Sequence, residues 1–332
     1  MILLLLACPS ADVPPLDTQD WSGASTVVAT VSQDYAVGAL ATVRLDDHAV
    51  RDTIVDISGD PGVHSSGDWV FQTNRYGYDT VRVYVPGDWS APTAEFALQD
   101  LSNPYDVDAC ADRLFITQHG ATFLAVHGFD GTEQARVDLT ALADDDGLPE
   151  PARGLVFGTE LLVSVMNYDR DDGWAPNGGA LVLVDCTTAE VIHQEPVATP
   201  TLMPADTGAL VHEHGEGLRR WDGVLGEVVV PLTENVVDGA AVGDKALVVT
   251  EEDGSYDVVC ADLVSGETTR HETPWYITDV ALTDGQAWLA ARAHWTAPDD
   301  RGGLLVWDIA SCTAQGEPIR TELDPFSMAV YD

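Results

Sequence analysis

Short runs of apolar residues, separated by turn-forming residues, fill the chain from residue 26 onward. They are rich in Val, Ile, Leu and Thr, and they recur about every 8 to 12 positions without the period of a helix. This pattern predicts an all-β domain. Its clearest expected strands are residues 26–31, 69–72, 80–85, 114–117, 161–165, 180–184, 246–250 and 303–307.

The apolar runs are themselves organised in a longer repeat. A dipeptide that ends in proline precedes a new apolar run at Asp60-Pro61, Asn103-Pro104, Glu150-Pro151, Thr199-Pro200, Thr273-Pro274 and Asp324-Pro325, and Asn235-Val236 fills the one gap. The spacing averages about 44 residues, which is the length of a four-stranded antiparallel blade in a β-propeller. The repeat therefore predicts a propeller.

The two ends of the chain set the expected number of blades. Residues 324–332 match only the first strand of a repeat, whereas residues 26–59 hold three runs and no first strand. Pairing the C-terminal strand with the three N-terminal strands completes one blade and removes two open sheet edges. Six whole blades and this composite blade give seven. The stretch 199–234 is short and is followed by no proline, so six or eight blades stay open as alternatives.

Residues 70–84 read Val-Phe-Gln-Thr-Asn-Arg-Tyr-Gly-Tyr-Asp-Thr-Val-Arg-Val-Tyr. This segment resembles the core of the YVTN-type β-propeller repeats of bacterial surface proteins. At the level of the repeat, the resemblance covers residues 26–332. It implies a single propeller domain over that range and carries no particular activity.

The N-terminus resembles a targeting signal. Residues 1–8 are too few to span a bilayer, which needs about 20 apolar residues, but they suit an export segment. Leu5-Leu6-Ala7-Cys8 resembles the lipobox of bacterial lipoproteins, and this resemblance implies a lipidated Cys8. Residues 9–25 are rich in Pro, Ser and Asp, as in a flexible tether. We expect a protein of the bacterial envelope, at the outer membrane or cell surface and facing periplasm or exterior, that contacts the membrane only through its lipid.

The charge balance excludes several partners. The chain has 15 Lys and Arg against 55 Asp and Glu, a formal net charge of −40. A nucleic-acid partner needs a basic face, and a polybasic membrane contact needs the same, so neither is expected. An acidic surface favours cations, including Ca²⁺. The nine Trp, nine Tyr and seven Phe supply a large core, which excludes a disordered chain.

Four cysteines remain once Cys8 is assigned to the lipid. An even number in an exported chain indicates two disulfides, and four cysteines allow three pairings. The blade register favours Cys110–Cys186 and Cys260–Cys312, because each pair then joins adjacent blades. The alternative is four buried thiols. No CxxC motif is present, which disfavours a zinc ribbon.

In a propeller, the loops between second and third strands share a face with the loops between blades. Ligands reach the central channel from that face, so its polar and aromatic residues are the candidate binding residues. They are Asn74, Arg75, His119, Asn167, Trp174, His214, Glu251, His294 and Trp295.

Two segments have metal-ligand character. Asp169, Asp171 and Asp172 resemble the start of a calcium loop, although its twelfth position is Ala180 instead of Glu. His212 and His214 share one face of a strand and suit a transition metal if Glu216 or His119 supplies a third ligand. The alternatives are a solvated acidic loop and an ordinary polar strand end.

No GxSxG, HExxH, P-loop or GxGxxG motif is present. We therefore expect a monomeric, lipid-anchored propeller that binds a protein, a glycan or a small ligand. One alternative is a lactonase-like hydrolase or a lyase with a divalent metal over the channel, held by residues such as Asp169, His119 and His214. The other is a structural surface spacer. An exposed aromatic patch on one face would favour binding, and a metal with open coordination would favour the enzyme.

Overall fold

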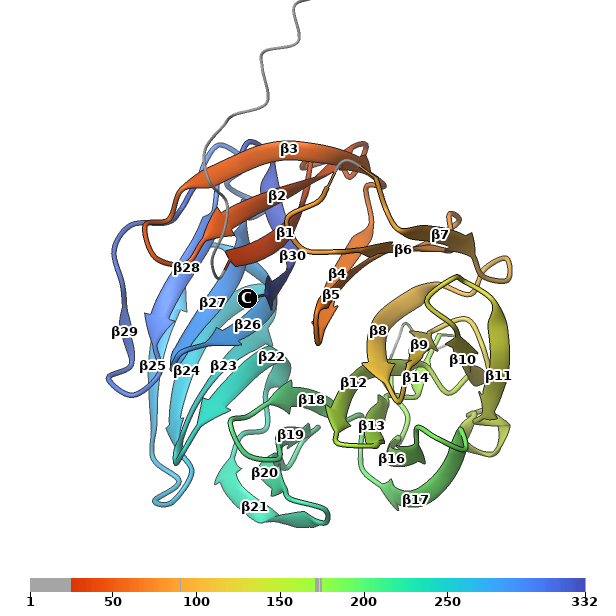
Figure 1. Ribbon diagram of the computed structural model, residues 1–332. Helices are drawn as coiled ribbons and strands as arrows, with labels where there is room; N and C mark the ends of the chain where they lie inside the picture. Colours follow the sequence, from red (N-terminus) through yellow and green to blue (C-terminus); the bar gives the residue numbers. More distant parts are fainter. Residues whose placement is uncertain (1–24, 90, 171–172, 174, 332) are drawn as a thin grey trace, which may run out of the picture.

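The computed structural model describes residues 25–331 except 90, 171–172 and 174. Seven four-stranded antiparallel sheets surround a central channel (Figure 1), so the prediction of a seven-bladed β-propeller is confirmed. From the innermost strand outward, three blades are β4 (Pro61–Ser66), β5 (Trp69–Asn74), β6 (Thr80–Tyr84) and β7 (Ala94–Ala97); β8 (Pro104–Cys110), β9 (Arg113–Gln118), β10 (Phe123–His127) and β11 (Glu133–Asp138); and β12 (Pro151–Phe157), β13 (Glu160–Val165), β16 (Ala180–Asp185) and β17 (Glu190–Pro196).

The next three blades complete the ring up to the junction of the termini. They are β18 (Thr201–Pro204), β19 (Ala209–Glu213), β20 (Gly217–Trp221) and β21 (Leu225–Pro231); β22 (Asn235–Val242), β23 (Lys245–Glu252), β24 (Ser255–Asp262) and β25 (Thr268–Thr273); and β26 (Tyr276–Thr283), β27 (Gln286–Arg292), β28 (Gly303–Asp308) and β29 (Thr313–Ala314). The stretch 199–234 is thus a complete blade despite its length. A 3-10 turn, η1 (Thr140–Leu142), and a small hairpin of β14 (Tyr168–Asp169) and β15 (Ala175–Pro176) lie in loops.

The last blade contains both ends of the described chain. β30 (Asp324–Tyr331) is its innermost strand, followed by β1 (Ser25–Val31), β2 (Gly38–Arg44) and β3 (Val50–Ile57). β30 pairs with β1 from Val31↔Asp324 to Ser25↔Tyr331, and the Thr26 hydroxyl donates to the Ala329 carbonyl at 3.1 Å. The ring closes as the sequence predicts, because this pairing leaves neither strand as an open edge.

The position of a strand within its blade decides its composition. The two middle strands are covered by neighbouring blades on both faces, so β16 is buried from Ala180 to Val184 and reads as a continuous apolar run. The outermost strands face water, and β17 is almost wholly exposed. The core therefore lies between the blades. Trp288 of β27, for example, is fully buried among Val28, Met328 and residues of its own blade.

Two disulfides join adjacent blades. Cys110 at the end of β8 bonds to Cys186 after β16, and Cys260 of β24 bonds to Cys312 in the turn before β29. These are the pairs that the blade register predicts. Each closes a loop of more than fifty residues, and such a cross-link typically stabilises a fold by about 3 to 4 kcal/mol.

Several predictions concern residues outside the described part of the chain. They are the export segment 1–8 with Cys8, the tether up to residue 24, and Asp171, Asp172 and Trp174 of the long β13–β16 loop. Within the part that the structure describes, no helix is both long and apolar enough to cross a membrane.

Candidate functional site

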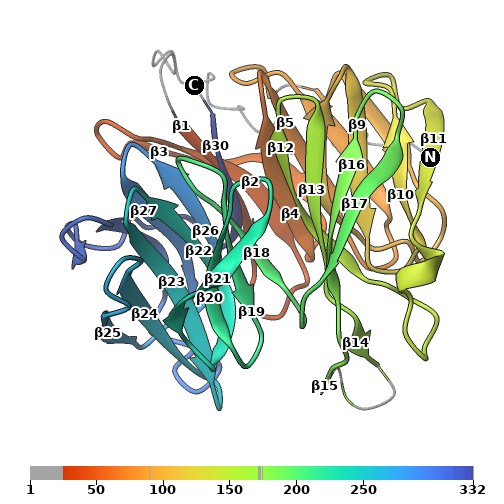
Figure 2. The same cartoon turned by 90° about the horizontal axis from the view of Figure 1, so that it is seen from below.

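The central channel contains a cavity of about 750 Å³, to which the innermost strands of all seven blades contribute. In the view from below, the blades stand side by side around this channel, and the β14–β15 hairpin projects from one face (Figure 2). That hairpin belongs to a loop between second and third strands, so it marks the face on which the sequence places ligand entry.

Carboxylates in the wall of the channel tie several innermost strands to their neighbours. Asp106 of β8 accepts a hydrogen bond from the Gly154 amide of β12 at 2.9 Å. Asp238 of β22 accepts from the Val280 amide of β26 at 2.9 Å. Each of these carboxylates lies beside an irregularity in strand pairing, and such bulges redirect a side chain toward a neighbour.

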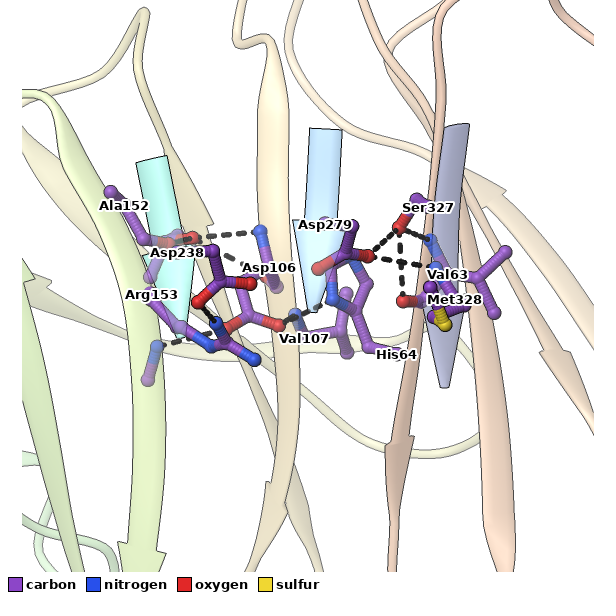
Figure 3. A network of polar contacts seen from close by, with 12 residues as sticks. Val63, His64, Asp106, Val107, Ala152, Arg153, Asp238, Asp279, Ser327 and Met328 are labelled. Carbon is purple, nitrogen blue, oxygen red and sulfur yellow. Dashed lines mark hydrogen bonds and ion pairs between the residues drawn. The ribbon is translucent and has the colours of Figure 1, made fainter. Parts of the chain in front are cut away.

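The same arrangement continues across the ring closure (Figure 3). Asp279 of β26 accepts from the Met328 amide of β30 at 2.7 Å and from the Ser327 hydroxyl at 2.9 Å. The Ser327 hydroxyl in turn accepts from the Val63 amide of β4 at 3.1 Å. We call Asp106, Asp238, Asp279 and Ser327 the inner belt. Its polar atoms bridge backbones, so much of their hydrogen-bonding capacity serves the fold.

Two side-chain pairs contact the inner belt. His64 Nδ1 lies 2.7 Å from Asp106 Oδ1, and the Arg153 guanidinium lies 2.5 Å from Asp238 Oδ1 (Figure 3). Burial disfavours the charge of Asp106, but its interaction with His64 outweighs burial and holds the pKa of Asp106 below its usual value. Burial dominates at Asp238 and raises its pKa to about 7, even though Arg153 opposes this shift.

Two buried polar atoms of this region have no hydrogen-bond partner among the described residues. They are Asp108 Oδ2 and His64 Nε2. Burial, and then the nearby Asp106 carboxylate, raise the pKa of Asp108 well above its usual value. A Cβ at residue 154 would approach Asp108 Oδ2 to 1.9 Å, so Gly154 makes room for this carboxyl group. Both residues line the cavity, and their unpartnered atoms are suited to meet a ligand or water.

Arginine and aromatic side chains surround the mouth of the channel. The Arg75 guanidinium pairs with Asp60 at 2.6 Å and lies 5.1 Å from the ring centre of Tyr105 and 5.4 Å from that of Phe326. The face of Tyr105 stacks on His119, with ring centres 4.1 Å apart. Burial, reinforced by nearby arginines, lowers the pKa of His119 to about 3, so this imidazole is neutral.

The exposed aromatic side chains of the described residues share one face. They are Tyr35 in the β1–β2 loop, Tyr76 and Tyr78 in the β5–β6 loop, and Trp295 in the β27–β28 loop. Each of these loops joins a second strand to a third strand of its blade, so all four lie on the face where the sequence predicts ligand entry. Tyr76 and Trp295 are the most open, at 82% and 77% exposed. We call these four residues the aromatic rim.

Of the candidate binding residues predicted from the sequence, some line the cavity and others contact residues around it. Arg75 and Glu251 line the cavity, and His119 supports Tyr105. The remaining described candidates do not line it. Three of them use side chains to hold loops: Asn74 accepts from the Ser58 amide, Asn167 donates to the Leu142 carbonyl, and His294 contacts the Gly254 carbonyl. The backbone amide of His214 donates to the Ala198 carbonyl. Trp295 is exposed and belongs to the aromatic rim.

The expected transition-metal sets are not assembled. His212 is buried, its Nε2 lies 3.0 Å from the Leu232 carbonyl, and burial lowers its pKa to about 4. The backbone carbonyl of the loop after β21 therefore contacts a nitrogen that a metal would need. Asp169, His119 and His214 do not come together as one group either. Among the described residues, the one group of three ligand atoms close enough for a metal is Cys260, His271 and Cys312.

The inner belt is not among the residues predicted from the sequence, although the sequence carries a signal for it. Asp106 and Ser327 of the belt, and Arg153 that pairs with Asp238, each lie two residues after the proline that opens their blade, and Asp238 lies three residues after Asn235. A polar residue at that place in an otherwise apolar innermost strand points toward the channel. The dipeptides that end in proline indicated the number of blades, and the residues that follow them also contribute the polar side chains of the channel.

No protein-family model and no curated protein sequence matches this chain. Its fold is similar to the β-propeller domain of the Trilobed protease from Pyrococcus furiosus, with a TM-score of 0.55 and 12% identity over 91% of this chain and 93% of that one. It is also similar to streptogramin B lyase (TM-score 0.54, 14% identity, 81% and 87% coverage) and to Citrobacter koseri AztD (TM-score 0.50, 13% identity, 93% and 97% coverage). At these identities the likenesses establish the propeller fold and leave the function open.

Proposed function

We propose that this protein binds a small polyhydroxylated ligand, such as a saccharide, in its central channel and performs no chemistry on it. The observation that carries this proposal is the aromatic rim over a polar cavity. Aromatic faces stack on the apolar faces of sugar rings, and exposed aromatic side chains gathered on one face are typical of binding surfaces.

The charge of the cavity favours a hydrogen-bond donor as the ligand. Asp108 and Glu251 offer carboxyl groups to the cavity, whereas its cations, Arg75 and Arg153, are already paired with Asp60 and Asp238. Ligand hydroxyl groups can donate to carboxyl oxygens, and an anionic ligand would meet a chain of net charge −40. The ligand class is therefore neutral or cationic.

The inner belt supports binding over catalysis. A catalytic carboxylate needs a free oxygen that faces the substrate, but Asp106, Asp238 and Asp279 each accept backbone hydrogen bonds from a neighbouring blade. The specific exception is the His64–Asp106 pair, whose free Nε2 suits a general base. A lyase or hydrolase that uses His64 is the second candidate, and ligand turnover that is lost in His64→Gln would support it.

We also propose that the protein acts in the bacterial envelope as a monomer, held by a lipid on Cys8. The two disulfides support an oxidising compartment. Labelling of cells with a fatty-acid analogue tests the anchor. Wild-type protein should take up the label, the Cys8→Ser variant should not, and an unlabelled wild type would contradict the anchor.

The binding proposal is tested with three panels of probes: mono- and disaccharides, polyamines, and dicarboxylates. Thermal shift is measured first and calorimetry follows on any hit. We expect saccharides to bind and Asp108→Ala to weaken binding by about tenfold or more, because the ligand hydroxyl loses its acceptor. Asp68→Ala, in the exposed turn that follows β4, is the matched control and should bind as wild type. Binding of dicarboxylates alone, or equal affinity of the two variants, would refute the proposal.

A further inference from the structure

A second cluster of chemically reactive side chains lies apart from the channel. Cys260 is in β24, His271 is in β25 of the same blade, and Cys312 lies in the turn between β28 and β29 of the next blade. His271 Nε2 is 3.3 Å from Cys312 Sγ, and the three ligand atoms all lie within 4.8 Å of one another. A turn between third and fourth strands belongs to the face opposite the aromatic rim, so this cluster is independent of the proposed ligand site.

The two disulfides of the chain differ in their surroundings. Cys110 and Cys186 are 4% and 0% exposed and belong to one apolar core cluster. Cys312, in contrast, is partly exposed in its turn and contacts an imidazole nitrogen. A reductant reaches an exposed sulfur more easily than a buried one. The Cys260–Cys312 bond is therefore the more accessible of the two to thiols in solution.

We propose that Cys260, His271 and Cys312 form a thiol-dependent binding site for a divalent transition metal such as Zn²⁺, which the disulfide closes and reduction opens. Two thiolates and one imidazole are the ligands that zinc prefers. These three residues fill three positions of a tetrahedral ion, and water takes the fourth. The observed nitrogen–sulfur separation already matches the distance of about 3.5 Å between neighbouring ligands of such an ion.

The reaction balances with a dithiol as the reductant. One thiolate of the dithiol attacks a sulfur of Cys260–Cys312 and forms a mixed disulfide, and its second thiol then displaces the protein sulfur. The reductant leaves as a cyclic disulfide, and its two electrons and two protons stay on two protein thiols. Binding of M²⁺ forms two metal–sulfur bonds and one bond to His271 Nε2, and it releases the two thiol protons.

The test uses Co²⁺ as a spectroscopic probe on the full chain. Protein is reduced with a phosphine, which binds Co²⁺ less strongly than a dithiol does, and is then titrated under argon. We expect one equivalent of Co²⁺ to bind, with a thiolate-to-cobalt charge-transfer band and the visible bands of a tetrahedral ion. Oxidised protein should show neither band. Reoxidation should release the metal.

The second disulfide supplies the matched control. Cys110→Ser/Cys186→Ser should keep the cobalt spectrum, and Cys260→Ser/Cys312→Ser should lose it. His271→Gln keeps every cysteine and should weaken binding at least about tenfold, because it removes one of three ligands. It remains informative if a double variant fails to fold. Charge-transfer bands in oxidised protein, an unchanged affinity in His271→Gln, or no band in folded protein with two titrated thiols would each overturn the proposal.

Discussion

Burial can keep an acidic side chain neutral even where an arginine and a backbone amide contact it. Glu150, at the entrance to β12, is the clearest case outside the inner belt. Its side chain is fully buried, one oxygen accepts from the Arg170 guanidinium at 2.9 Å, and the other accepts from the Tyr168 amide at 3.0 Å. Burial outweighs these partners and raises the pKa of Glu150 from 4.5 to about 7. The neutral form is therefore favoured by the fold.

This shift predicts a measurable dependence of stability on pH. The unfolded chain releases the Glu150 proton near pH 4.5, whereas the folded chain keeps it to about pH 7. Folding stability is therefore lost as the pH rises through this window, by on the order of 3 kcal/mol from this group. Glu150→Gln should flatten the stability profile between pH 5 and 8 in urea unfolding. The exposed Glu227→Gln should leave the profile unchanged, and a profile equally steep in both variants would contradict the prediction.

At the scale of the element, the innermost strands do two tasks at once. Their ladder hydrogen bonds hold a blade together, and in β8, β22 and β26 an irregularity in the pairing redirects a polar side chain to a neighbouring blade. Asp279 shows this most directly, since it links β26 to β30 where the ring closes. The pairing of strands in hairpins was predictable from the alternation of apolar runs and turns, because hairpin pairing is local in the sequence. The bulges were not, because they depend on how neighbouring blades meet.

Removing the Asp279 carboxylate should weaken the ring closure. Asp279→Ala leaves the buried Met328 amide without its partner, and we expect a loss of about 2 to 4 kcal/mol in the free energy of unfolding. Asp68→Ala, in an exposed turn, should change it by less than about 0.5 kcal/mol. Chemical denaturation of the two variants measures the difference. A loss at Asp279 as small as that at Asp68 would show that the bridge is dispensable.

At the scale of the molecule, net charge opposes compactness. The chain carries −40, and most of its few cations are engaged in local ion pairs, as Lys245 is with Asp262 at 2.6 Å. Repulsion among the remaining acids acts over the whole surface and is screened by salt. The disulfides and the closed ring resist this repulsion.

We therefore expect added salt to stabilise the protein. Raising NaCl from about 0.01 to 0.15 M shortens the Debye length from about 30 to about 8 Å, so most of the rise in Tm should occur in that interval. Calorimetry across the series checks this. Sucrose at the same osmolality as the NaCl is the control for non-ionic effects. A Tm that falls as NaCl is added would show that attractive ion pairs outweigh the repulsion.

The sequence by itself determined the all-β class, and it favoured seven blades, the joining of the termini and the two disulfide pairs over their alternatives. These follow from periods of apolar residues and from the register of a repeat, which are local or regularly spaced along the chain. Only the tertiary structure decided the site. His64, Asp106 and Arg153 come from three blades, and Cys260, His271 and Cys312 from two, so their meeting depends on the packing of blades against one another. Tertiary structure also decides against a metal site at His212 and His214. The His212 imidazole contacts the Leu232 carbonyl, which belongs to a loop twenty residues further along the chain.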